Sequence, residues 1–129
     1  MTKSLDSKKA AGYLTKAENS LRMAKIAIQE KAYDNAVMSA IHSAINALDA
    51  LTVSYLGKRA SGAHTDVLSL IQGILDASEF NDVKKQFGSL LGMKNESEYQ
   101  PNPMSSSDAN NAVKWAERIV NRVKAKLKK

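Results

Sequence analysis

The residues of this chain best suited to chemistry lie between positions 90 and 99, where an apolar run ends in a polar segment. Lys94, Asn95 and Tyr99 bring a cation, an amide and a hydroxyl to this segment. Four residues separate Lys94 from Tyr99, and in a helical or near-helical turn both side chains can point to one side. This arrangement predicts an anion site, in which both groups share one phosphate. Alternatively, Lys94 and Asn95 only complement the helix dipole and cap the turn.

A second polar group lies on an otherwise apolar predicted helix. His42, Asn46 and Asp49 are spaced by four and three residues, so they share one helix face. Polar side chains inside a bundle must be paired or hydrated. In one interpretation they line the pocket of Lys94 and Tyr99, and His42 supplies the proton exchange that Tyr99 cannot. In the other, they form a buried hydrogen-bond network that fixes helix or dimer packing.

Other features argue against RNA binding at Lys94 and against a conventional enzyme. Glu96 and Glu98 place negative charge beside Lys94, which opposes the binding of an anion. No glycine-rich phosphate loop, nucleophile elbow, zinc spacing or helix-turn-helix signature is visible. His42 and Asp49 lack the third and fourth ligands that a metal site needs. We therefore predict neither a metal nor a cofactor.

The apolar spacing predicts an all-α fold, because no segment alternates with the period of a strand. Helices are expected from about Leu5 to Lys31, from an N-cap at Asp34 to Leu56, from about Thr65 to Ala77, from about Asn81 to Met93, and from near Ser107 onward. The helix that ends at Leu56 has the widest apolar stripe and should be central. Residues 57–62 and 100–105 are expected to be loops. The result is an up-and-down antiparallel bundle of four main helices plus a shorter one, in a single domain over residues 1–129.

Composition suggests where the protein resides. The chain has no cysteine, hence neither disulfides nor a thiolate nucleophile, which fits the cytoplasm. Its first residues lack the apolar run of a signal peptide. The most apolar stretch, residues 36–56, is interrupted by the polar stripe at His42, Asn46 and Asp49. We expect a cytoplasmic protein without a membrane segment.

The net charge of +6 is concentrated in residues 114–129. This basic segment could follow nucleic-acid phosphates, or its cations could complement a helix C-terminus and solvate the tail. Tyr99 and Trp115 could stack on a base, or each could anchor the rim of the core.

Three strings together resemble the HEPN domain, named for higher eukaryotes and prokaryotes nucleotide-binding. They are residues 40–51 (AIHSAINALDAL), residues 90–99 (LLGMKNESEY) and, in the last helix, Ser107-Asp108-Ala109 with Ala116-Glu117-Arg118. The resemblance covers nearly the whole chain. It implies a helical bundle that pairs as a homodimer, with the polar end of the fourth helix near its copy across a two-fold axis.

The resemblance also implies a site. Active members of the family are metal-independent ribonucleases, whose signature is an arginine, a polar residue and a histidine a few positions later. Lys94, Asn95 and Tyr99 look like these three positions, so two of the three are altered. A tyrosine with a pKa of about 10 is a poorer general base than a histidine with a pKa of about 6.5. Lysine neutralises a phosphate but lacks the two-pronged grip of arginine.

These features predict a HEPN-like domain that binds RNA or a nucleotide phosphate as a homodimer, with weak or no ribonuclease activity. The predicted ligand-binding residues are Lys94, Asn95, Tyr99, His42, Asn46 and Asp49, and the candidates for catalysis are Tyr99 and His42. One alternative is a non-catalytic helical interaction or dimerisation module. Another is a toxin-like, metal-independent ribonuclease that uses His42. Some family members act as toxins beside a nucleotidyltransferase antitoxin, so such a partner is also an expectation.

Overall fold

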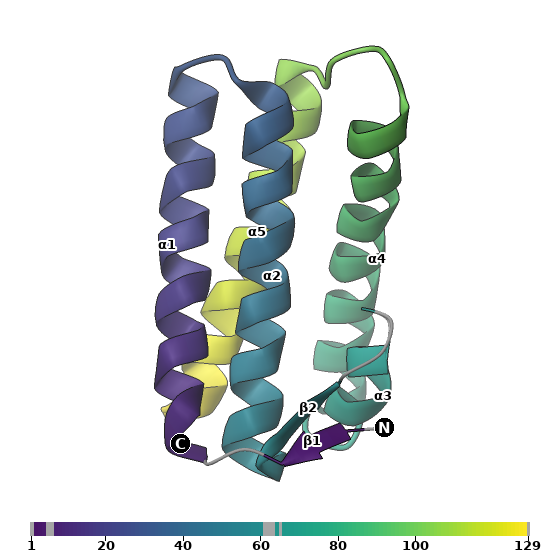
Figure 1. Cartoon of the computed structure of the whole chain (residues 1–129). Coiled ribbons are helices and arrows are strands. Elements are labelled where there is room, and N and C mark those ends of the chain that lie inside the picture. The colour runs from purple at the N-terminus through teal and green to yellow at the C-terminus, as the bar shows by residue number, and fades with distance from the viewer. Residues whose placement is uncertain (1, 5–6, 61–63, 65, 129) are drawn as a thin grey trace.

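The computed structural model describes residues 2–4, 7–60, 64 and 66–128. Four long helices run alternately up and down, and a short helix precedes the third of them (Figure 1). The described helices are α1 (Ala10–Gln29), α2 (Tyr33–Leu56), α3 (Asp66–Ile71), α4 (Ala77–Tyr99) and α5 (Ser106–Leu127), with a 3-10 turn, η1 (Ser7–Lys9), before α1. The predicted all-α, up-and-down bundle is therefore confirmed.

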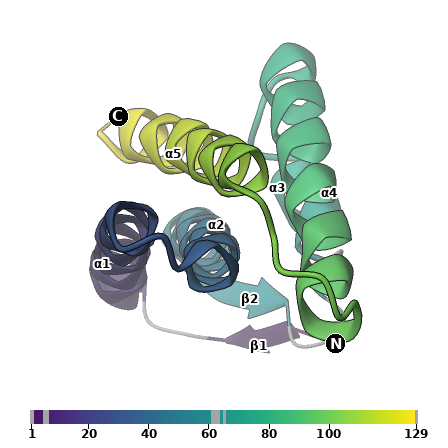
Figure 2. The same cartoon turned by 90° about the horizontal axis from the view of Figure 1, so that it is seen from above.

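Helix α2 is the centre of the bundle, as its wide apolar stripe predicts. It packs against α1, α3, α4 and α5, and α4 lies on the far side of α2 and α5 from α1 (Figure 2). Small side chains let α2 approach its neighbours closely, and alanines at 36, 40, 44, 47 and 50 are all fully buried. Ser43, also fully buried, donates a hydrogen bond to the carbonyl oxygen of Ala17 at 2.7 Å, which ties α1 to α2.

By length and composition alone, α2 could cross a membrane. Most of its apolar window, 72%, is buried inside the bundle, and a core helix gives this result as readily as a membrane span does.

Helix α4 extends beyond both of its predicted ends. It begins at Ala77 instead of Asn81 because Asp76 and Glu79 form a capping box: the Asp76 carboxylate accepts from the Glu79 N–H at 2.8 Å, and the Glu79 carboxylate accepts from the Asp76 N–H at 3.0 Å. It continues past Met93 to Tyr99. The whole segment with the predicted site residues is therefore helical.

Other predicted boundaries were also wrong. Helix α3 ends at Ile71, well before the expected Ala77, because a turn and the new cap at Asp76 follow it. Helix α1 begins at Ala10, and the expected start at Leu5 lies outside the described residues.

Asp34 does not cap α2, whose N-cap is Ala32. Its carboxylate instead accepts a hydrogen bond from the backbone N–H of Met104 at 3.0 Å. This bond ties the start of α2 to the connection between α4 and α5.

Two short strands depart from the expectation of a chain without strands. Strands β1 (Thr2–Ser4) and β2 (Lys58–Ala60) pair antiparallel, with Lys3 opposite Arg59. Gly57 adopts the left-handed conformation, φ 67°, that ends α2 and turns the chain into β2. The predicted loop at 57–62 was therefore wrong for the three residues of β2. The sequence did not reveal this strand because three residues are too few to show a periodic pattern.

Candidate functional site

The predicted site lies at the C-terminal end of α4, and its geometry is organised around Glu98. The ammonium of Lys94 donates a hydrogen bond to the Glu98 carboxylate at 2.8 Å, one helical turn away. This hydrogen bond lowers the pKa of Glu98 against the opposing effect of desolvation, and the Tyr99 hydroxyl and His42 lower it further. The same bond raises the pKa of Lys94, which therefore stays charged. Three predicted site residues thus act on one carboxylate.

The continuous helix changes the expected relation between Lys94 and Tyr99. Five positions along an α-helix turn a side chain by about 140°, so the two side chains leave α4 in different directions. The Tyr99 side chain is 75% exposed, whereas Lys94 is partly covered. Lys94 and Tyr99 therefore do not share a site directly, but both act on the carboxylate of Glu98.

His42 of α2 lies on the same side of the bundle as this carboxylate. A hollow of about 360 Å³ lies between the start of α2 and the end of α4. His42 and Glu98 both line it, together with Asp34, Asn35, Met38, Ser39 and Ser97. The fold therefore brings His42 close to the end of α4, but of the polar stripe of α2 only His42 lines this hollow. Lys94 and Tyr99 lie beside this hollow without lining it.

Glu98 is the residue whose role the sequence reasoning missed. The sequence interpretation treats it only as a charge that opposes anion binding. The signal was its spacing of four residues from Lys94, which on a helix favours an ion pair.

The other predicted site residues lie apart from the hollow. Asn46 donates its side-chain N–H to the backbone carbonyl of His42 at 2.9 Å, a contact within one helix turn. Asn95 is exposed on α4. Asp49 is 8% exposed and faces Arg59 of β2 at 3.9 Å. The polar stripe of α2 is therefore divided between His42, which faces α4, and Asp49, which faces β2.

Burial gives Asp49 unusual acid–base behaviour. Desolvation raises the pKa of its carboxyl to about 6, and the attraction of Arg59 opposes this rise only in part. The Arg59 guanidinium also lies 5.9 Å from the centre of the Tyr13 ring, a cation–π contact with α1. Within the described part of the chain, no three histidine or carboxylate side chains are grouped to hold a metal ion.

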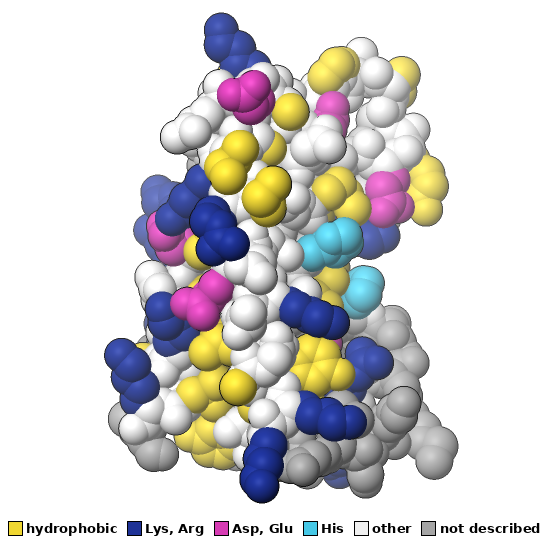
Figure 3. All heavy atoms as spheres, turned by 60° about the vertical axis from the view of Figure 1, so that its left-hand side comes forward, with side chains coloured by type: hydrophobic (Ala, Val, Ile, Leu, Met, Phe, Trp, Pro, Cys, Tyr) yellow, Lys and Arg dark blue, Asp and Glu magenta, His cyan; other side chains and the backbone are white. Residues whose placement is uncertain are grey.

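The basic last helix is partly neutralised by its neighbours. Lys124 pairs with Glu18 of α1 at 3.0 Å, and Lys126 pairs with Glu79 of α4 at 3.0 Å. Arg122 contacts both Glu79 and Asp82. Some of the cations of α5 therefore hold helices together, a role that neither interpretation of the basic segment foresaw. On the α1 side of the molecule, lysine and arginine side chains are spread among acidic and hydrophobic ones (Figure 3).

Comparisons with known proteins agree with this fold. The chain is similar to TT1696 from Thermus thermophilus, with a TM-score of 0.76 and 20% identity over 92% of this chain and 98% of that one. It is also similar to ST0689, an archaeal HEPN homologue, with a TM-score of 0.70 and 20% identity over 90% of this chain and 95% of that one. No curated protein matches the chain. The sequence model of the HEPN domain matches residues 10–126, and the chain therefore belongs to the HEPN domain family.

Proposed function

We propose that this HEPN domain binds the phosphate of RNA or of a nucleotide at the end of α4, as a homodimer and with weak or no ribonuclease activity. One observation carries the proposal: the Lys94 ammonium donates to the Glu98 carboxylate at 2.8 Å, and His42 lines a hollow with the same carboxylate. Tyr99 and His42 also help to lower the pKa of Glu98. Groups that favour one anion at a point can favour another there. A phosphate oxygen that takes the place of the carboxylate would meet the same ammonium and hydroxyl.

Glu98 competes with a phosphate but does not exclude it. The ion pair is partly exposed, with side-chain accessibilities of 27% and 31%, and ion pairs of this kind contribute little to stability. The terminal phosphate of a nucleotide carries more negative charge than a carboxylate and offers more acceptor oxygens, and the phosphodiester of RNA matches the carboxylate in charge. Displacement of Glu98 by a phosphate therefore requires little free energy.

Weak or absent cleavage follows from the residue types at the site. A tyrosine is a poorer general base than the histidine of the family signature, and Lys94 lacks the planar fork of an arginine. The exposed ring of Tyr99 is available to a second copy of the chain, which supports a two-fold arrangement at this end of α4. A nucleotidyltransferase partner is part of this proposal only through the family resemblance.

The test is a binding titration of labelled single-stranded RNA at several salt concentrations. We expect Lys94→Ala to weaken binding about tenfold and to reduce the salt slope by about 0.7, the loss of one phosphate contact. Lys84→Ala removes the same side chain from an exposed position of α4 and should leave the affinity unchanged. Affinity that is equal in wild type and Lys94→Ala would remove Lys94 from the site.

A non-catalytic interaction module is the second candidate, because Lys94 already has a partner in Glu98. This candidate predicts a dimer in a sedimentation measurement and no salt-dependent RNA binding. If the protein binds RNA but sediments only as a monomer, the homodimer part of the proposal is wrong and the phosphate site at Lys94 stands.

A further inference from the structure

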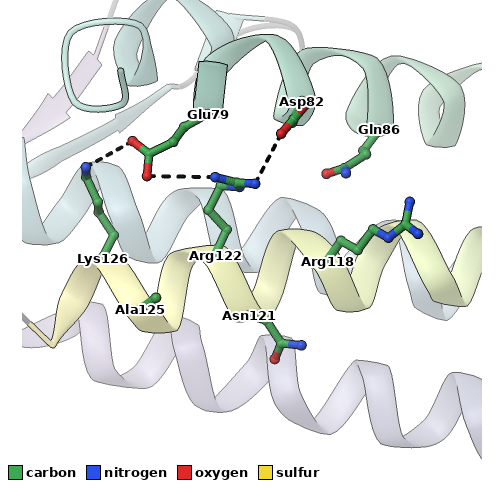
Figure 4. A pocket seen from close by; sticks show the side chains of 8 residues that line it. All are labelled: Glu79, Asp82, Gln86, Arg118, Asn121, Arg122, Ala125 and Lys126. Carbon is green, nitrogen blue, oxygen red and sulfur yellow. Dashed lines mark hydrogen bonds and ion pairs between the residues drawn. The ribbon is translucent and has the colours of Figure 1, made fainter. Parts of the chain in front are cut away.

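A second polar groove lies between α4 and α5, away from the Lys94 end of α4. It comprises a hollow of about 650 Å³ (Figure 4) and an adjoining hollow of about 270 Å³. The two hollows share Asp82, Gln86 and Arg118, and Trp115 lines the smaller one. They therefore form one groove, with Gln86 and Arg118 at its middle.

The acidic residues of this groove already have partners. Glu79 pairs with Lys126 at 3.0 Å and with Arg122 at 3.7 Å, and Asp82 pairs with Arg122 at 3.2 Å (Figure 4). Arg118 is exposed and makes no hydrogen bond or ion pair with any residue that the structure describes. The groove therefore offers one free guanidinium, among the described residues, which suits a phosphate or carboxylate.

Gln86 supplies an independent reason to expect a ligand. Its side-chain oxygen, Oε1, is buried and has no hydrogen-bond partner in the described structure. A buried acceptor without a donor is unfavourable, so an N–H group placed there would stabilise the site. Figure 4 shows the Gln86 amide and the Arg118 guanidinium both extending into the space between α4 and α5.

We propose that this groove binds a nucleotide unit. Arg118 would hold its phosphate, and Gln86 Oε1 would accept a hydrogen bond from an exocyclic amine of its base, as glutamine does with adenine. Trp115 is half-buried in the smaller hollow and offers a flat ring on which a base can stack. The unit is either a free mononucleotide or one nucleotide of a single strand, because both present the same groups.

This groove is separate from the proposed phosphate site at Lys94, and substitutions in each of the two sites distinguish them. The probes are adenosine monophosphate, adenosine, inorganic phosphate and a short single-stranded oligoadenylate, titrated calorimetrically. We expect Arg118→Ala to weaken adenosine monophosphate binding about tenfold, the loss of a charge-assisted hydrogen bond. Lys114→Ala removes an exposed cation of α5 that does not line the groove and should have no effect. Lys94→Ala should likewise leave mononucleotide binding to this groove intact.

Gln86→Met gives the sharper readout, because it keeps the shape of the side chain and removes its acceptor. It should weaken binding of adenosine monophosphate several-fold and leave inorganic phosphate unchanged, whereas Arg118→Ala should weaken both. Helical circular dichroism checks that each variant folds. Stronger binding of oligoadenylate, lost with Arg118→Ala, would assign the site to a strand. Absence of binding of every probe to wild type, or binding insensitive to Arg118 and Gln86, would overturn the proposal.

Discussion

Glu98 lies one helical turn after Lys94 and holds the lysine ammonium at 2.8 Å. The pair places a carboxylate of the protein itself where the family resemblance implies the phosphate of a ligand. Tyr99 and His42 act on the same carboxylate. Under the proposed function, the charge at position 98 therefore controls how available Lys94 is to an anion.

Removal of that charge should strengthen RNA binding. Glu98→Gln keeps the shape of the side chain but frees the Lys94 ammonium, and we expect several-fold tighter binding of single-stranded RNA at low salt. The gain should shrink as salt is added, because exposed charges are screened. Glu96→Gln, a neighbouring exposed residue, is the matched control. An unchanged affinity in Glu98→Gln would show that the charge of Glu98 does not limit RNA binding.

Ribonuclease activity should be weak or undetectable in the wild-type protein. Incubation of a labelled RNA with wild type, Tyr99→Phe and His42→Ala measures it directly. Cleavage that persists in Tyr99→Phe and disappears in His42→Ala would instead establish His42 as the proton-exchanging group, from the hollow that it shares with Glu98.

Stability should fall as pH rises through the titration of Asp49. The folded-state pKa of about 6 is above the ordinary value of 3.8, so the folded protein holds this proton more tightly than the unfolded chain does. This contribution is fully present below about pH 4 and is lost as pH rises through about 6. Asp49→Asn stays neutral and should stabilise the fold at pH 8 by about 1 kcal/mol after allowance for solvent screening, with little effect at pH 4.

Urea unfolding of both proteins at several pH values gives the free energies of unfolding for this comparison. A variant less stable than wild type at pH 8 would mean that the pairing of Asp49 with Arg59 outweighs the burial of the charge.

Loss of Glu79 should loosen the contact between α4 and α5. Its carboxylate accepts the Asp76 N–H in the capping box and pairs with Lys126 and Arg122 of α5. The hydrogen bonds from Asp76 and Lys126 lower the pKa of Glu79, so its contribution is present at neutral pH and lost as the carboxyl protonates in acid. Glu79→Ala should lower the free energy of unfolding by about 1 kcal/mol at pH 7.

The control for this experiment is Glu96→Ala, which removes the same side chain from an exposed position of the same helix. Equal stability of the two variants would show that neither the cap nor the ion pairs of Glu79 contribute measurably.

The long helices could be predicted because each buries a periodic apolar stripe over five or more turns. Their ends could not, since the caps at Asp76 and Ala32 depend on local geometry that single residue types do not determine. The ribbon of β1 and β2 joins segments more than fifty residues apart, and such pairings leave no local pattern. Lys94 and His42 could be singled out from the sequence as candidates, but only the full length of α4 shows that both act on the charge of Glu98.

The hydrogen bond from Met104 to Asp34 means that the helix carrying His42 also anchors the chain as it returns from α4 to α5. Asp34 is itself a wall of the hollow beside His42. One wall of that hollow is consequently tied to the connection between α4 and α5. Because Met104 is also buried in the core, an insertion that moves it would disturb the packing of the bundle and the Asp34 wall of the hollow together.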